Sequence, residues 1–508
     1  MVELNKIPHI EEIANRGVYG GAAAKPVETF QARSAASDKI LPSLEDAIRA
    51  TGLKDGMTIS FHHHFRGGDH IVNQVVGKLA EMGFKNLTLA ASSLSNVHAP
   101  LIEHIQNGVI THIETSGLRG QLAEKISRGL MDFPIVFRSH GGRAAAIASG
   151  ELHIDVAFLG APSSDPYGNA NGYSRDGDES ISCGSMGYAR PDARYADKVV
   201  VLTNNLVQYP NAPFAIPEYD VDYVVVIDDI GDPKGIMSGA TRYTKNPKEL
   251  LIAQAAAEVI DAAGYFYDGF SMQMGSGGAS LAAARFLRQM MIDKGIRCRF
   301  ALGGITGQIA AMHEEGLIDR ILDVQSFDLD AATSLKKNRF HQQIDASYYA
   351  SFLADAAVDQ LDFVILSALE IDTDFNVNVL TGSDGVIRGA IGGHPDTAAG
   401  ASLSVVVAPL TRGRIPSIID KVNTIVTPGD TVDVVVTDQG VAVNPRRPEL
   451  AEKLKKAGIK VYTIQQLKEK AEALVGKPDP IRYKERIVGV VMYRDNTVVD
   501  VIRQIEED

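Results

Sequence analysis

The chain has 508 residues and a formal net charge of −13 at pH 7, with 45% of its residues hydrophobic and 22% charged. Its length exceeds what one hydrophobic core usually supports, so at least two domains are expected. The acidic balance argues against a general nucleic-acid surface, because phosphate binding needs basic patches. Cys183 and Cys298 lie far apart without a CxxC spacing, so we expect reduced thiols and no disulfide framework.

The N-terminal segment and the apolar runs bear on where the protein works. Met1–Gly20 is polar and charged and lacks the apolar stretch of a signal peptide. The longest apolar runs, such as Val405–Leu410, are far too short to cross a membrane. We therefore expect a cytoplasmic protein without membrane contact. Residues 1–40 are predicted to be an N-terminal extension that wraps a neighbouring subunit, and a homo-oligomer is expected.

Strands and helices alternate from residue 41 onward. A helix is predicted over Leu44–Thr51, with Ser43 as its N-cap and Gly52 at its end. Helical segments such as Ala99–Asn107 and Leu122–Gly129 separate the predicted strands. These strands are Met57–Phe61, Leu87–Ala91, Val109–Ile113, Ile135–Phe137 and Val156–Leu159. The alternation predicts an α/β fold with a mainly parallel sheet flanked by helices.

The second half of the chain repeats this plan. Its helix Pro247–Ala263 precedes the strand and glycine loop DGFSMQMGSGGAS, which corresponds to DGMTISFHHHFRGGD in the first half. Four polar residues match at a constant offset of 207: Asp155 with Asp362, Asp165 with Asp372, Asn169 with Asn376, and Asn171 with Asn378. The chain is therefore predicted to contain two tandem α/β domains, residues 41–235 and residues 236–508.

The end of the second half is predicted to differ from the first. Glu449–Gly458 and Ile464–Val475 have the spacing of closing helices, and Ile487–Tyr493 and Val498–Ile502 are predicted strands of a late β-ribbon.

The stretch Ser367–Asp396 follows an apolar strand and is dense in Gly, Asn and Asp. A strand that runs into glycines and then into a helix lets backbone N–H groups approach a phosphate or an oxyanion. Its tail, Thr381–His394, is predicted to form one wall of a site through its glycines and Ser383.

Two similar domains are expected to hold a ligand in the cleft between them, lined by loops at the strand ends such as Ser139–Arg143. The candidates for orienting a substrate or stabilising an oxyanion are residues of the strand-end loops: Gly67, Gly68, Gly277, Gly278, Gly303, Gly304, Gly392, Gly393 and His394. GSGGAS lacks the spacing of a dinucleotide fingerprint or a P-loop.

Arginines adjoin these glycine loops. A guanidinium beside bare backbone suits a carboxylate or phosphate, although each arginine alone is also compatible with a structural salt bridge or a surface turn. The candidates for binding an anionic substrate are Arg66, Arg119, Arg143 and Arg388, together with Ser383.

The run His62-His63-His64 raises the question of a metal site. Consecutive side chains on a strand point to opposite faces, so the three rings cannot all bind one ion. No Cys or HExxH spacing is nearby. We therefore predict no metal site and expect packing or a polar contact with substrate.

Several of these motifs resemble the CoA-transferases, whose paired α and β halves correspond to two fused copies. The chain is more closely similar to the citrate lyase alpha subunit family, from Leu41 to the C-terminus. The motifs that carry this resemblance are DGMTISFHHHFRGGD, SGLRG, SHGGR, GATR, ALGGIT, LSALEIDTDFNVNVLTGSDGV, GGH and APLTRGRIP.

The resemblance implies a transferase that exchanges the acetyl group of an acetyl-acyl-carrier-protein thioester for citrate. The products are acetate and the citryl thioester, within a complex that converts citrate to acetate and oxaloacetate. The implied partners are a citryl-thioester lyase (beta) subunit and an acyl carrier (gamma) subunit. The carrier holds a CoA-derived, phosphopantetheine-type arm, and no cofactor is expected in this chain.

One departure from the wider superfamily bears on the mechanism. Many relatives carry a nucleophilic glutamate where this chain has Leu302-Gly303-Gly304, with no carboxylate. We therefore expect a ternary complex in which a citrate carboxylate attacks the acetyl thioester and a mixed anhydride forms. Glu370 is the alternative nucleophile, and a role in orienting a loop is the competing interpretation.

Two other functions remain open at this point. One is an acetate-type or short-chain acyl CoA-transferase that uses free CoA. The other is a non-catalytic small-molecule-binding module, because a fold alone does not fix a function.

Overall fold

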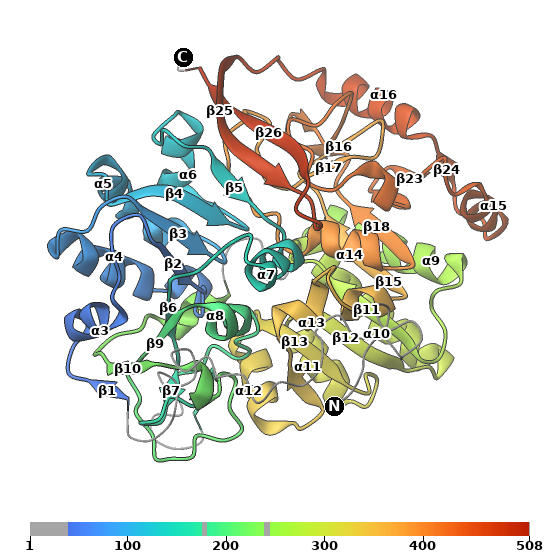
Figure 1. Ribbon diagram of the computed structural model, residues 1–508. Helices are drawn as coiled ribbons and strands as arrows, with labels where there is room; N and C mark the ends of the chain where they lie inside the picture. Colours follow the sequence, from blue (N-terminus) through green and yellow to red (C-terminus); the bar gives the residue numbers. More distant parts are fainter. Residues whose placement is uncertain (1–38, 175–179, 238–243, 507–508) are drawn as a thin grey trace, which may run out of the picture.

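The computed structural model describes residues 39–174, 180–237 and 244–506. The predicted extension, residues 1–40, is described only at Lys39 and Ile40, and the GATR motif at 239–242 lies outside the described residues. The chain forms two α/β halves that lie side by side, coloured blue to green and light green to red (Figure 1). Among the described helices, none combines the length and apolar character needed to span a bilayer.

The first half is built on a ten-stranded sheet that is parallel except for its last pair. In spatial order its strands are β1 (Ile40–Leu41), β10 (Tyr223–Val226), β9 (Lys198–Thr203), β6 (Val156–Gly160), β2 (Thr58–Phe61), β3 (Leu87–Ala91), β4 (Ile110–Thr115), β5 (Ile135–Phe137), β25 (Tyr483–Met492) and β26 (Val498–Ile505).

The helices of this half connect the parallel strands. They are α3 (Leu44–Thr51), α4 (Ile71–Glu81), α5 (Leu101–Gln106), α6 (Gly120–Ser127), α7 (His140–Ser149) and α8 (Ala189–Tyr195). The predicted helix Leu44–Thr51 is confirmed, and its ends have a clear cause. Ser43 Oγ accepts a hydrogen bond from the Asp46 N–H, and Gly52 ends the helix with a φ of 71°.

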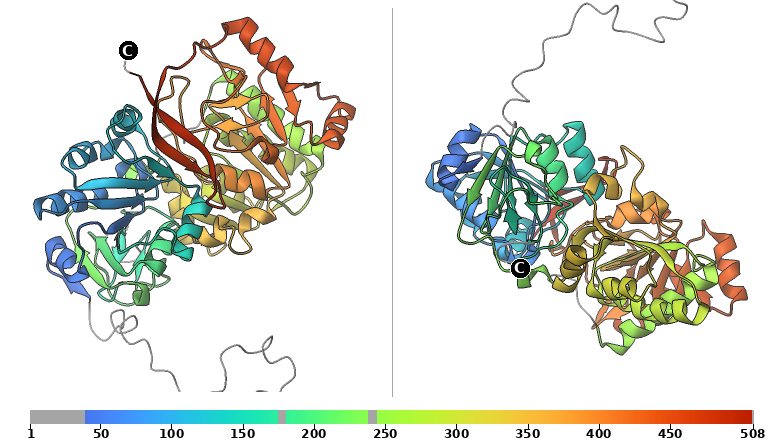
Figure 2. Two further views of the ribbon diagram at one scale, coloured as in Figure 1. Left: turned by 45° about the horizontal axis from the view of Figure 1, so that its top comes forward. Right: turned by 90° about the horizontal axis from the view of Figure 1, so that it is seen from below.

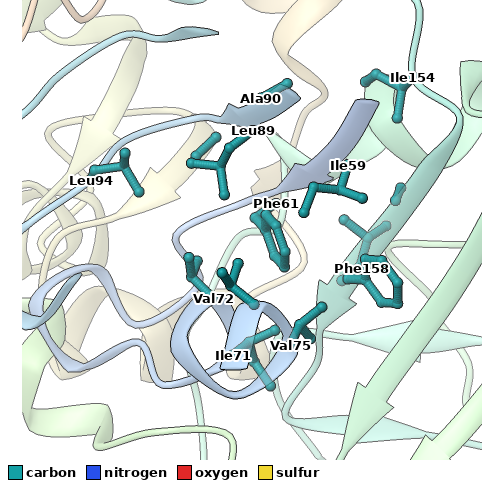
Figure 3. Close-up of a cluster of buried hydrophobic side chains, with 14 of the residues drawn as sticks. Ile59, Phe61, Ile71, Val72, Val75, Leu89, Ala90, Leu94, Ile154 and Phe158 are labelled. Carbon is teal, nitrogen blue, oxygen red and sulfur yellow. The ribbon is translucent and has the colours of Figure 1, made fainter. Parts of the chain in front are cut away.

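The core of the first half holds the end of β2 in place. The side chains of Ile59 and Phe61, two residues apart on β2, point to the face of the sheet that α4 covers. Phe158 of β6 packs beside them (Figure 3). The rings of Phe61 and Phe158 stack with their centroids 5.9 Å apart. Ile71 and Val75, one helical turn apart on α4, complete the contact. Core packing around Phe61 therefore holds the start of the loop that follows it in place.

The second half has a nine-stranded sheet, parallel except between β22 and β23. In spatial order its strands are β14 (His341–Gln343), β13 (Ile321–Ser326), β12 (Cys298–Ile305), β11 (Phe270–Met274), β15 (Phe363–Ser367), β18 (Leu403–Val407), β22 (Val434–Thr437), β23 (Gly440–Val443) and β24 (Val461–Tyr462). Its helices are α9 (Pro247–Ala263), α10 (Gly278–Lys294), α11 (Gly307–Glu314), α12 (Leu329–Lys337), α13 (Ala346–Ala350), α14 (His394–Gly400), α15 (Pro448–Lys456) and α16 (Ile464–Val475).

The C-terminal β-ribbon returns to the first half. β25 pairs in parallel with β5, and β26 forms the outer edge of that ten-stranded sheet (Figures 1 and 2). The predicted ribbon is confirmed, but the predicted division into residues 41–235 and 236–508 differs from the sheet topology here. The physical reason is that β5 would otherwise present an unpaired edge, which β25 covers.

Hydrogen bonds repeat between the halves at the matched residues. Asp165 Oδ1 accepts from the backbone N–H of Asn169 at 3.1 Å, and Asp372 Oδ1 accepts from that of Asn376 at 2.9 Å. Each asparagine also donates its side-chain amide to the other oxygen of its aspartate. The loops form matching short strand pairs, β7 (Ser163–Ser164) with β8 (Ala170–Asn171) and β16 (Glu370–Asp372) with β17 (Val377–Asn378). The predicted duplication is therefore confirmed.

One predicted loop is the start of a helix. The segment Ser139–Arg143 opens α7, with Ser139 Oγ accepting from the Gly142 N–H at 2.9 Å. A Cβ on Gly141 would lie 2.1 Å from the carbonyl oxygen of Ala350 in the second half. The glycine allows close packing of the two halves, since α7 lies against α13 and α14 (Figure 1).

Candidate active site

A cleft of about 1430 Å³ opens between the two halves. Residues that line it from the first half include His63, Arg66, Arg119, His140 and Tyr188, and those from the second half include Gln273, Gly277, Gln325, Tyr349 and His394. The strand-end loops of both sheets supply most of this lining, because parallel strands direct their carboxyl ends to one edge.

Arg66 and Arg119 enter the cleft from two neighbouring loops of the first half. Arg66 begins a short turn after β2 with a φ of 53°, and its guanidinium lies 4.5 Å from the ring centroid of Phe327 in the second half. Burial and the nearby charge of Arg119 lower the pKa of Arg66 to about 10. Burial also lowers the pKa of Arg119, and among the described residues no acidic side chain pairs with it. Two desolvated cations side by side favour an anionic ligand.

The three consecutive histidines have separate partners. His62 Nε2 lies 2.9 Å from the Gly160 carbonyl, and burial lowers its pKa to about 4. His64 Nδ1 lies 2.9 Å from Asp69 Oδ2, deep in the first half. His63 faces the other way, between Ser92 at 2.5 Å and Gln325 at 3.2 Å. The three histidines follow β2, which ends at Phe61, and His63 is the one of the three that lines the cleft.

The start of α7 and the GGH loop meet at the cleft. The His140 N–H donates to the Gly392 carbonyl at 2.9 Å, and the rings of His140 and Tyr188 lie 4.2 Å apart. Burial and the charges of Arg143 and Arg66 lower the pKa of His140 to about 3, so its imidazole is neutral. Asp396 on α14 accepts from the Gly141 N–H at 3.0 Å, which joins the two halves at this wall.

The end of β12 carries glycines where a side chain would have no room. Gly303 has a φ of 97°, and a Cβ there would lie 2.6 Å from Cδ of Gln273. A Cβ on Gly304 would lie 2.1 Å from the ring of Phe327. Among the described residues that line the cleft, the one carboxylate is Glu249, at the first turn of α9.

The N-terminus of α10 also points at the cleft. Gly277 is its N-cap, and Gly278 is its first residue. A Cβ on Gly277 would lie 2.0 Å from Ser367 Oγ, so the loop passes close to the end of β15. Unpaired N–H groups at the start of a 17-residue helix form a place for a negatively charged oxygen.

The structure brings together most of the predicted site residues but not all of them. Those that line the cleft are Arg66, Gly67, Arg119, Gly277, Gly278, Gly304, Arg388, Gly392, Gly393 and His394. Gly68 instead packs against the 233–236 turn, where a Cβ would lie 2.0 Å from the Asp232 carbonyl. Gly303 lies behind Gln273.

Three predicted residues have other surroundings. Arg143 is buried within α7 and forms two hydrogen bonds with Asp192, at 2.7 and 2.8 Å, so it is a structural partner. Ser383 and Glu370 line a second, smaller cavity of about 190 Å³. Glu370 is held there by Asn378 and Asn423, and burial raises its pKa. Arg388 lines the cleft but is paired with Asp384.

Sequence reasoning did not single out several residues of the cleft, among them His140, Tyr188, Gln273, Gln325 and Tyr349. A signal was present for the two glutamines, because each is a polar residue near the carboxyl end of an otherwise buried strand. No local pattern marks Tyr188 or Tyr349, which reach the cleft through the packing of α8 and α13.

Comparison with known proteins places the chain in one family. The family model described as citrate lyase, alpha subunit (CitF) matches residues 37–505. The citrate lyase alpha chain of Haemophilus influenzae is 57% identical, over 97% of this chain and 98% of that relative. A crystal structure from Streptococcus mutans, described as the putative alpha subunit of citrate lyase in complex with citrate, has a TM-score of 0.90 and 57% identity. It covers 93% of this chain and 92% of that one.

A more distant structure bears on the fold alone. The malonate decarboxylase alpha subunit from Acinetobacter baumannii has a TM-score of 0.64 at 16% identity, and covers 88% of this chain and 95% of that one. The predicted α/β fold with mainly parallel sheets is confirmed, and so is the resemblance that the sequence motifs carry. The chain belongs to the citrate lyase alpha subunit family.

Proposed function

We propose that the chain is the transferase subunit of a citrate lyase complex. It exchanges the acetyl group of an acetylated carrier for citrate, which gives acetate and a citryl thioester. Family membership supports this assignment over a short-chain CoA-transferase or a non-catalytic binding module. The observation that carries it is the pair Arg66 and Arg119, two buried cations in a cleft that is large enough for two reactants.

The proposed reaction needs no nucleophile from the enzyme. One citrate carboxylate, already an anion, adds to the acetyl thioester carbonyl, and the carrier thiolate leaves. The mixed acetyl–citryl anhydride remains in the cleft. The thiolate then adds to the citryl carbonyl and expels acetate, which keeps the oxygen that came from citrate. Glycines at the end of β12, and the position of Glu370 in another cavity, support this route.

The residues of the chain orient the reactants and stabilise charge. Arg66 and Arg119 hold citrate carboxylates, and the N–H groups at the start of α10 face developing negative charge. Correct placement lowers a barrier by about 7–11 kcal/mol. One preorganised donor contributes about 3 kcal/mol. Together these effects account for catalysis without a covalent bond between enzyme and substrate.

We further propose the partners and the carried group. A citryl-thioester lyase (beta) subunit and an acyl carrier (gamma) subunit complete the complex, and the carrier brings a phosphopantetheine-type arm. The apolar lining around Leu366, Val407 and Pro409 suits the arm, and the carried group is proposed in place of a cofactor of this chain. The complex works in the cytoplasm as a homo-oligomeric assembly, and the two free thiols, Cys183 and Cys298, are compatible with a reducing compartment.

Acetate release tests this function. The chain, mixed with acetylated carrier and citrate, is expected to release acetate and form a citryl thioester, both absent when citrate is omitted. Acetyl-CoA in place of the carrier is expected to be the poorer donor. Equal or better use of acetyl-CoA contradicts the assignment of the carrier, and no citrate-dependent release contradicts the function.

A further inference from the structure

Gln325 occupies a distinctive position in the cleft. It lies near the end of β13 and pairs in register with Gly304 of β12, next to the strand end that carries no carboxylate. Phe327, two residues further on, lies under the guanidinium of Arg66. Gln325 is 7% exposed, and its side chain lines the cleft between the two halves. A neutral amide is thus set beside the anion-binding arginine.

The orientation of this amide is set by a residue of the first half. Ser92 Oγ accepts from the backbone N–H of His63 at 3.0 Å and lies 2.5 Å from His63 Nδ1. The Ser92 hydroxyl has no other acceptor among the described residues, so it donates to Nδ1. The proton of the neutral imidazole is then on Nε2, which lies 3.2 Å from Gln325 Oε1 and donates to it.

This chain of hydrogen bonds leaves the amide nitrogen of Gln325 for the cleft. No described side chain or carbonyl accepts a hydrogen bond from that nitrogen. Gln273 Oε1 is a fully buried polar atom without a hydrogen-bond partner, and the Gln325 nitrogen is not such an atom. It therefore reaches open space. Burial, with Arg66 and His140 nearby, lowers the pKa of His63 well below its usual value, which keeps the imidazole neutral.

We propose that the Gln325 amide donates a hydrogen bond to the oxyanion that forms when citrate adds to the acetyl thioester, and that Ser92 and His63 position this amide across the domain interface. The inference rests on the proposed function. A thioester carbonyl is uncharged before attack and carries negative charge afterwards. A neutral donor therefore gains more in the tetrahedral state than in the bound substrate, unlike a guanidinium that already holds a carboxylate.

The test compares variants in the complex with its carrier, by kcat and by KM for citrate. Gln325→Met keeps the shape and removes the donor, and is expected to lower kcat about 10²–10³-fold. Its KM for citrate is expected to stay within about threefold, because the donor acts after binding. Gln325→Glu, which is isosteric, is expected to lower kcat at least as far. Gln465→Met, on the exposed surface of α16, is the matched control with unchanged kcat.

Ser92 and His63 are positioning residues, and a double-variant cycle tests that role. Ser92→Ala alone is expected to lower kcat about tenfold. In the Gln325→Met background it is expected to change nothing further, because it acts only through the amide. Multiplicative effects of the two changes would overturn the positioning role.

Gln325 variants that fold and keep the wild-type kcat, or that raise KM instead, would overturn the oxyanion role. Thermal melting of each variant separates misfolding from lost chemistry, and the Glu variant remains available if the Met variant is unstable. The wild-type chain reports on the function itself. Absence of citrate-dependent acetate release by wild type contradicts the proposed function, whereas equal rates in wild type and the variants contradict only the role of Gln325.

Discussion

Arg119 and Arg143 both lie beside glycine in the sequence, but they have different roles in the structure. Arg119 lines the cleft, and burial lowers its pKa without an acidic partner among the described residues. Arg119→Gln is expected to raise KM for citrate by about 10- to 100-fold, since hydrogen bonds to charged groups contribute about 1.5–3 kcal/mol. The melting temperature is expected to change little. Steady-state kinetics with varied citrate check this, and an unchanged KM would contradict the anion-binding role.

Arg143 is expected to show the opposite behaviour. Its guanidinium pairs with Asp192, which is fully buried. Arg143→Leu leaves that carboxylate unpaired in the interior, so the free energy of unfolding is expected to fall by about 3–5 kcal/mol. Urea unfolding measures the loss. The double variant with Asp192→Leu is the control, because it removes both charges and is expected to recover much of the stability.

The sequence identified the residue types of the site better than their positions. Arg66, Arg119 and the glycines beside them were predictable because arginine next to bare backbone is a local pattern. Arg143 has the same pattern, yet Gly141 beside it allows the close contact between α7 and α13. That contact joins residues more than 200 positions apart, and a local pattern cannot report it.

Among the strands and helices, β12 has an end whose backbone conformation requires glycine. Gly303 has a φ of 97°, and a Cβ added there would lie 2.6 Å from Cδ of the Gln273 amide. Gly303→Ala combines a left-handed backbone with a close contact, so a loss of about 1–3 kcal/mol in stability is expected. Chemical denaturation gives this value. Gly316→Ala is a useful control, because it shares a positive φ of 78° but has no neighbour within 4 Å of its Cβ position.

The predicted elements agree best with the structure where the two halves repeat. Thr58 of β2 and Ser271 of β11 donate their N–H groups to the matched Asp155 and Asp362. The loops at Asp165 and Asp372 also carry the same hydrogen bonds, so one half supports the interpretation of the other. Agreement fails at α7, where the prediction placed a loop. Two glycines near a helix start usually argue against a helix, and here the capping by Ser139 and Asp396 outweighs that tendency.

For the whole molecule, the C-terminal hairpin ties the halves together. β25 pairs with β5, and Asp500 on β26 accepts from the Ile425 N–H of the second half at 2.7 Å. Removal of residues 482–508 is expected to expose the edge of β5 and to separate thermal unfolding into two transitions. Differential scanning calorimetry measures this. A single transition at the wild-type temperature would contradict the proposal that the hairpin joins the two halves.

The buried histidines predict how stability depends on pH. Burial lowers the pKa of His62 to about 4, of His140 to about 3 and of His394 to about 4. The unfolded chain binds these protons near pH 6.5, so stability is lost as the pH falls below that value, by up to about 1.4 kcal/mol per pH unit for each group. Asp396, whose pKa burial raises to about 6, has the opposite sign and offsets one histidine. A lower melting temperature at pH 5 than at pH 7 is expected. An equal or higher melting temperature at pH 5 would contradict the larger contribution of the histidines.

The central claim is that citrate itself supplies the nucleophile in the cleft between the halves. A single turnover with the chain in excess over acetylated carrier, and with citrate labelled by ¹⁸O in its carboxylates, tests it most directly. Direct attack predicts acetate that carries one ¹⁸O atom from citrate in the first turnover. Unlabelled acetate, with the label left on a protein carboxylate, would contradict the account and would point to a nucleophile in the chain.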